Sequence, residues 1–128
     1  NDTSWQGISI AINGSTANLS GKAISASGSG GSVTTYNTTR QIATIGGTNI
    51  TTNTFTNVGL YFPNYRSSNF KSFSVDSVSE NNASTAYTQM FGGLWSNTAA
   101  ITSISFTTDG TAIPDFIQYS SATLYGVT

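Results

Sequence analysis

Few residues of this 128-residue chain are suited to acid–base chemistry. Glycoside hydrolysis needs two carboxylates across a cleft, and the candidates are Asp76, Glu80, Asp109 and Asp115. Asp76 and Glu80 are four positions apart and would share a face if one unbroken strand carried both. The run ENNAS that begins at Glu80 is typical of a loop, however, where acids are usually solvated. Ser-His-Asp catalysis is excluded because the chain has no histidine. We therefore expect a protein that is not an enzyme.

Metal chemistry has little support in the sequence. The chain contains neither Cys nor His, which excludes disulfides and the usual ligands of zinc and copper sites. Asp76, Asp109 or Asp115 could bind a hard cation together with backbone carbonyls, but no D-x-D-x-D-G run supports such a site. We expect no cofactor and no metal.

Charge is also scarce, and it limits the classes of partner. The formal net charge is -1, with 7% of residues charged, so no basic field is available to hold a nucleic acid or an anionic membrane surface. No apolar run approaches the roughly 18 residues of a membrane span, and no signal peptide is visible. We expect no nucleic-acid partner and no membrane insertion.

Sugar binding is the remaining chemistry to consider. β-Sandwich proteins that bind sugars commonly use exposed aromatic rings beside amide and carboxylate groups. Core or edge packing is the more ordinary role for each tyrosine. The loops 63–69, 80–84 and 109–115 are the best candidates for a shared binding end. The candidate contact or receptor residues on them are Tyr65, Arg66, Asn81, Asn82, Asp109 and Asp115.

The elements that must position these loops are short strands. Ile8, Ile10 and Ile12 alternate with small or polar residues, which is typical of a half-buried strand, and so do Val58, Leu60 and Phe62. Asn13-Gly14 and Asp109-Gly110 are hairpin signals. Further strands are expected at 18–25, 33–36, 41–45, 70–78, 85–91, 116–120 and 122–127. About eight to ten short strands predict an all-β fold, a jelly-roll-like antiparallel β-sandwich, with residues 1–128 as one domain.

The stretch from Phe91 to Phe106 is predicted to hold the centre of the core. We interpret it as two core strands with Trp95 at their junction, buried with Leu94, Ile104 and Phe106. The pair Gly92-Gly93 marks a bulge or a place where a bulky ring comes close.

Several longer motifs resemble a known family. They are PNY at 63–65, VSENNAS at 78–84, GLWSNTAAITSI at 93–104 and QYSSATLYG at 118–126, with a looser match over 8–22. Together they are similar to a family of tailed-bacteriophage proteins, mostly uncharacterised or described as virion structural proteins. The resemblance implies a β-sandwich of the phage particle and identifies no catalytic residue.

The chain departs from the family in two places. Family members usually carry further strands before the position of Asn1, so this domain is expected to lack N-terminal strands or to recruit one from a neighbour. The turn from Asp109 to Asp115 is also longer than in the family.

Two functional hypotheses follow from the resemblance. The first is a structural part on the virion surface, either capsid decoration or a fibre component, bound to copies of itself and to other virion proteins. The second is an adhesin module of a tail fibre that binds a host receptor or glycan. An open sheet edge favours self-association, and we expect a trimer.

Overall fold

The computed structural model describes residues 5–28, 32–47, 51–80, 86–109, 116 and 118–127, and these contain strands and no helix. Among them, accordingly, no helix is long and apolar enough to cross a membrane. The eight strands are β1 (Trp5–Ile12), β2 (Leu19–Ser27), β3 (Ser32–Thr38), β4 (Gln41–Gly46), β5 (Asn57–Tyr61), β6 (Lys71–Glu80), β7 (Ala86–Trp95) and β8 (Ile104–Thr108).

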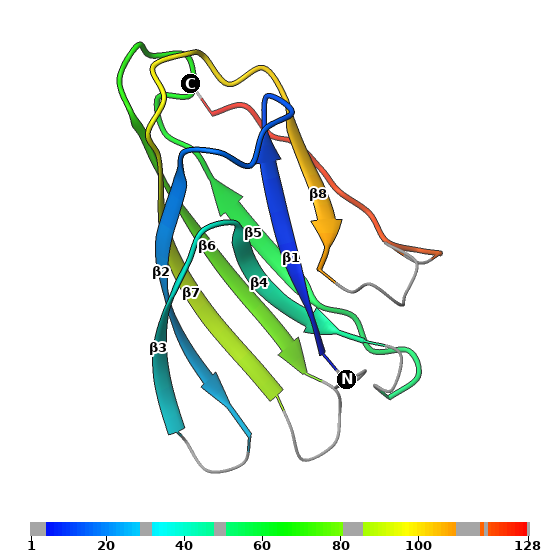
Figure 1. The fold of residues 1–128 in the computed structure, drawn as a ribbon. Coiled ribbons are helices and arrows are strands. Elements are labelled where there is room, and N and C mark those ends of the chain that lie inside the picture. Colours follow the sequence, from blue (N-terminus) through cyan, green and yellow to red (C-terminus); the bar gives the residue numbers. More distant parts are fainter. Residues whose placement is uncertain are drawn as a thin grey trace.

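The strands form two antiparallel sheets that pack as a β-sandwich (Figure 1). One sheet has the order β4-β1-β8 and the other β3-β2-β7-β6-β5. The first strand pairs with the last, and the second with the second last, which is the nested pairing of a jelly roll. β3 instead pairs with β2, and β4 pairs with β1. The predicted all-β sandwich is therefore confirmed.

Alternation along each strand builds the apolar part of the core. Ile8, Ile10 and Ile12 point inward from β1 and are almost fully buried. The register places Phe73 beside Gly93 and Val75 beside Phe91, so these side chains share the inner face of the larger sheet. Because successive strand residues point to opposite faces, the sequence pattern alone assigns most of these positions.

The other half of the inner face is polar. Ser25, Ser77, Ser79 and Gln89 are buried at the end of the larger sheet away from Trp95. The Gln89 Oε1 atom accepts a hydrogen bond from the Thr44 N–H at 2.6 Å, which joins β7 to β4 across the sandwich. No buried side-chain nitrogen or oxygen of the described residues lacks a partner. The sequence reasoning missed this polar half because alternating serines resemble a solvent-facing pattern.

The structure confirms one of the two interpretations of the Gly92-Gly93 pair, the close approach of a bulky ring. A Cβ atom on Gly93 would overlap the Phe73 ring, whereas a Cβ on Gly92 would meet nothing within 4 Å. Neither glycine interrupts β7, which continues through both to Trp95. Gly93 therefore allows the Phe73 ring to lie close against β7, whereas Gly92 has no such role.

Three expectations about the central stretch were partly wrong. Trp95 is buried, at 2% exposure, but Leu94 is 37% exposed because adjacent residues of a strand face opposite ways. Phe106 is paired with Ile10 and faces the core, yet it is 38% exposed because β8 is an edge strand of the smaller sheet. The segment around Ile101 is not a strand, although Ile101 is buried.

The expected closing strands are also absent from the part of the chain that is described. Residue 116 and residues 118–127, here called the C-terminal segment, lie in no strand (Figure 1). Its side chains are exposed throughout, including Tyr119, Leu124, Tyr125 and Val127. The alternation that predicted a strand at 122–127 is present in the sequence, but none of the described strands pairs with it.

Candidate functional site

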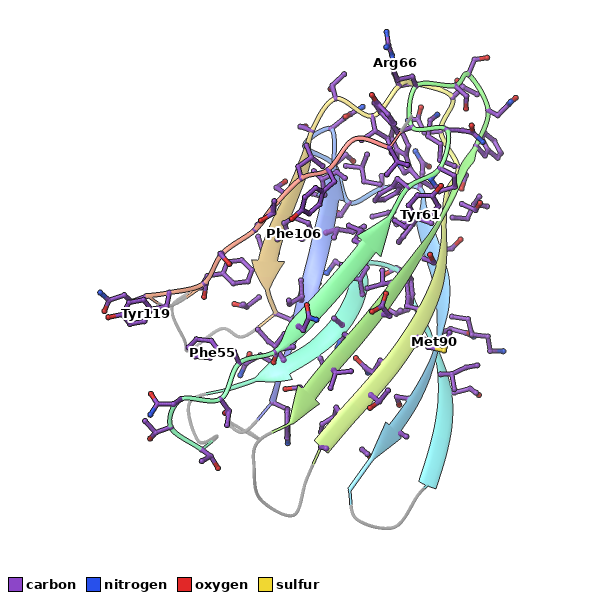
Figure 2. The ribbon with its side chains drawn as sticks, turned by 180° about the vertical axis from the view of Figure 1, so that it is seen from behind. Phe55, Tyr61, Arg66, Met90, Phe106 and Tyr119 are labelled. Atoms are coloured by element: carbon purple, nitrogen blue, oxygen red, sulfur yellow. The ribbon has the colours of Figure 1, made fainter. Side chains whose placement is uncertain are left out.

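Tyr65 and Arg66 lie at one end of the sandwich, where three connections meet. We call this the loop end; it consists of residues 13–18, 62–70 and 96–103. These connections gather because β1, β5 and β7 all run toward this end, and β2, β6 and β8 start from it. Figure 2 shows Arg66 at this end, pointing away from the body of the protein.

Two backbone hydrogen bonds fix the connection that carries Tyr65. Asn64 adopts a left-handed backbone conformation, with φ of 52°, and its carbonyl accepts the Ser67 N–H at 2.9 Å. The Tyr65 carbonyl accepts the N–H of the buried Ile101 at 2.8 Å. The Tyr65 ring is 48% exposed. The backbone is thus fixed while the side chains of Tyr65 and Arg66 remain accessible.

Lys71 anchors the loop end from the inside. Its side chain is among the most buried in the described residues, at 1% exposure. The ammonium group donates to the carbonyl oxygens of Asn69 at 2.7 Å and Asn97 at 3.2 Å, and lies over the Trp95 ring. A buried cation is costly unless its hydrogen bonds are satisfied. Here two carbonyls and an aromatic face replace water, and the same contacts tie residues 62–70 to residues 96–103.

Asn13 joins the remaining connection to the loop end. Its Oδ1 atom accepts from the N–H groups of Thr102 at 2.8 Å and Ser103 at 3.1 Å. Its Nδ2 group donates to the Ala100 carbonyl at 2.8 Å. With φ of 51° at Asn13 and 76° at Gly14, the pair makes the tight turn that the sequence predicted. The turn closes on a single Ile12–Ser15 bridge, and the chain then crosses to the other sheet.

Asp109 lies at the opposite end of β8 and is engaged by its own chain. The Ser9 hydroxyl donates to its Oδ1 atom at 2.6 Å, and Arg40 forms an ion pair with the same oxygen at 3.5 Å. The Asp109 N–H donates to the Gly7 carbonyl at 2.9 Å. A hydroxyl that donates to a carboxylate in this way satisfies the carboxylate and anchors the end of β8 to β1.

The predicted contact residues therefore do not form one cluster. Tyr65 and Arg66 share the loop end, whereas Asp109 is at the far end, because successive connections of antiparallel strands alternate between the two ends. Asn81, Asn82 and Asp115 lie outside the described residues, as does the second half of the Asp109-Gly110 hairpin signal.

The acids also face apart. Asp76 is exposed on the face of the larger sheet that is turned away from the core, here called the outer face. Asp109 meets Ser9 on the outward side of the smaller sheet. Within the described ranges, no group of three or more acidic side chains is placed to hold a metal ion. An open groove of about 600 Å³ near β2 and β3 is lined by Ser20, Gly21, Asn37, Thr38 and Thr39, none of them charged.

Sequence reasoning missed the two residues that organise the loop end. Lys71, Phe73 and Val75 are alternate residues of one strand, so the alternation already placed Lys71 on the inner face. Asn13 was interpreted only as a turn former, and its long-range bonds to residues 100–103 have no local signal.

Comparisons of this chain with family models, with curated proteins and with solved structures give no match.

Proposed function

We propose that this chain is a non-enzymatic structural protein of a tailed-phage virion, a β-sandwich module displayed on the particle surface as capsid decoration or as a fibre component. The resemblance of the motifs at 63–65, 78–84, 93–104 and 118–126 supports the phage context. The β-sandwich itself agrees with what that resemblance implies about the fold.

The observation that carries the proposal is the wide distribution of exposed apolar side chains. A part built into a particle needs contacts along extended surfaces, whereas an adhesin needs one compact cluster. Exposed large apolar residues occur on β2, β6, β7, β8 and the C-terminal segment: Ile24, Val78, Met90, Leu94, Phe106, Leu124, Tyr125 and Val127. Single exposed apolar residues are ordinary, whereas contiguous ones commonly mark protein–protein interfaces. Ile24 and Met90 are direct partners on the outer face, and Leu124, Tyr125 and Val127 are close in the sequence. These groups favour copies of this chain, as a trimer, and other virion proteins as partners.

Two further observations fit a structural part. Trp95, one of the two tryptophans of the chain, is inside the core and cannot stack on a sugar. The scarcity of charge leaves no basic surface for nucleic acid or for a membrane.

Imaging of the virus particle tests this proposal. We expect a gold-labelled antibody against the chain, or a particle map at side-chain resolution, to place it on the virion surface in contact with other virion proteins. A chain that is absent from purified particles would overturn the proposal.

Receptor recognition is the second candidate function, and the loop end favours it. Tyr65 is half exposed on a fixed backbone beside Arg66, and Tyr61 and Phe70 are exposed nearby in the sequence. Figure 2 shows Tyr61 and Arg66 toward the same end, with Phe55 at the other.

A glycan array with the intact chain separates the two functions. The structural proposal predicts weak or no binding. Specific binding that is abolished by Tyr65→Ala and kept by the control Phe55→Ala, with folding and particle assembly intact, would establish receptor recognition instead. Phe55 is a suitable control because it is also exposed, at 61% against 48% for Tyr65, and lies at the other end of the molecule from Arg66.

A further inference from the structure

The C-terminal segment exposes apolar side chains that a folded protein normally covers. Exposure is 80% at Tyr119, 94% at Leu124, 80% at Tyr125 and 84% at Val127. Within the described part of the chain, no hydrogen bond joins residues 121–127 to another residue. The backbone groups of this stretch are thus available for pairing, together with side chains that gain by leaving water.

A matching surface exists at the outer edge of the smaller sheet. Among the described strands, β8 pairs with β1 on one side and has no strand on the other; Thr108 makes a further contact, so the edge considered is that of residues 104–107. On its inner face Phe106 remains 38% exposed, although it lies opposite the buried Ile10. A strand added beyond β8 would extend this sheet and bring inward-pointing side chains over Phe106. Figure 2 shows Phe106 and Tyr119 on the β8 side of the molecule.

We propose that the C-terminal segment of one copy adds as a strand to β8 of a second copy of this chain. The segment follows its own β8 after a connection short enough for a local hairpin, yet residues 121–127 do not pair with it. Each copy carries both the free segment and the open edge, so exchange between identical chains satisfies both at once.

Charge and exposed apolar side chains agree with a second copy as the occupant. Neither β8 nor residues 116–127 contain a charged residue, so two copies meet there without repulsion and without desolvating an ion. Phe116, Tyr119, Leu124, Tyr125 and Val127 are the large exposed side chains. On an added strand Leu124 points to one face and Tyr125 and Val127 point to the other, so one of these two sets lies over Phe106 and leaves water there.

This inference deepens the proposed function and rests on it only in taking a copy of the chain as the partner. Particle imaging tests the virion role, and cross-linking of the purified chain tests the strand exchange. Their failures are therefore distinguishable, since a chain could exchange strands without belonging to a virion.

The absence of native cysteine makes the cross-link specific. Ser105→Cys places a thiol on β8 and Thr123→Cys places one on the segment, both at exposed positions. A short bismaleimide added to an equal mixture of the two single variants, one carrying a mass tag, is expected to give a product that contains both chains. The double variant is expected to cross-link at multiples of the monomer mass. A double variant that cross-links at monomer mass, or a mixture that gives no mixed product, would overturn the exchange.

Sedimentation of the full chain provides an independent readout. We expect wild-type protein to sediment as an oligomer and Leu124→Ser/Tyr125→Ser to sediment as a monomer that keeps the β-sheet signal of circular dichroism, with a lower melting temperature because the partner no longer stabilises the fold. The control Ile24→Ser/Met90→Ser removes two other exposed apolar side chains, at 52% and 67% exposure, from the outer face, which the strand exchange does not use, and should keep the oligomer. A monomeric wild type, or an oligomer lost only in the control, would show that the segment is not the interface.

Discussion

The Lys71 ammonium group lies 5.2 Å from the centre of the Trp95 ring, and the two residues are direct partners in the register of β6 and β7. This places a cation against an aromatic face with almost no access to water. A contact of this kind is stronger when it is desolvated than at a surface. The pair closes the core just beneath the loop end, so it couples the fold to the best candidate recognition surface.

Removal of the buried charge should loosen this closure. Lys71→Met leaves the carbonyls of Asn69 and Asn97 without their donor, and we expect a loss of about 2 kcal/mol in the free energy of unfolding, measured with urea. Lys22→Met is the matched control, because Lys22 is exposed on the outer face, and it should change stability little. Equal stability of the two variants would mean that the buried contacts contribute nothing net.

Truncation of the indole should be far more costly. Trp95→Ala removes a ring that is 2% exposed and leaves a cavity between the sheets, for which we expect about 3–5 kcal/mol of destabilisation. The adjacent Leu94→Ala, whose side chain faces outward, should cost about 1 kcal/mol or less. Denaturant titration followed by circular dichroism measures both. A silent Trp95→Ala would remove the central position that the core gives to this residue.

The two adjacent glycines should respond in opposite ways to the same substitution. Gly93→Ala forces a methyl group into the Phe73 ring, and overpacking of this kind typically costs about 1–3 kcal/mol. Gly92→Ala meets open space and restricts the unfolded chain, so it should be neutral or stabilising by up to about 1 kcal/mol. Melting temperatures of the two single variants test the difference, and the reverse order would contradict the packing described.

Asn13 should be needed for its side chain as well as for its backbone conformation. Asn13→Gly keeps the positive φ but removes the acceptor for Thr102 and Ser103, so we expect a loss of about 1–2 kcal/mol. Amide hydrogen exchange at Thr102 and Ser103 should accelerate in this variant. Unchanged protection of both amides would show that the Asn13 side chain does not hold the β7–β8 connection.

The sequence predicted most strands but not their long-range partners. Alternation identified the inner face of β1 through Ile8, Ile10 and Ile12, because burial on one face leaves a period of two along the chain. That period does not determine which strands become neighbours, so the pairing of β3 with β2 and of β4 with β1 could not be predicted from it. The same limit explains residues 122–127, whose strand-like pattern has no partner within the described chain.

The candidate site was predictable only in part. Tyr65 and Arg66 were selected because Pro63 and Asn64 end a strand, and the structure places both on an accessible loop. Asp109 was selected for its turn, but contacts with Ser9 and Gly7, about a hundred residues away, hold it against β1. Such contacts depend on the folded arrangement of distant segments, and no local pattern encodes them.

The hydrogen bond between Gln89 and Thr44 has a consequence for how the two layers are aligned. Small serine side chains give few features that could stop one sheet from sliding over the other. The Thr44 N–H reaches the Gln89 oxygen at only one position of β4 along β7, so this hydrogen bond selects the relative position of the two sheets. It fixes the offset of β4 over β7 at the polar half of the sandwich, where side-chain shape alone does not define it.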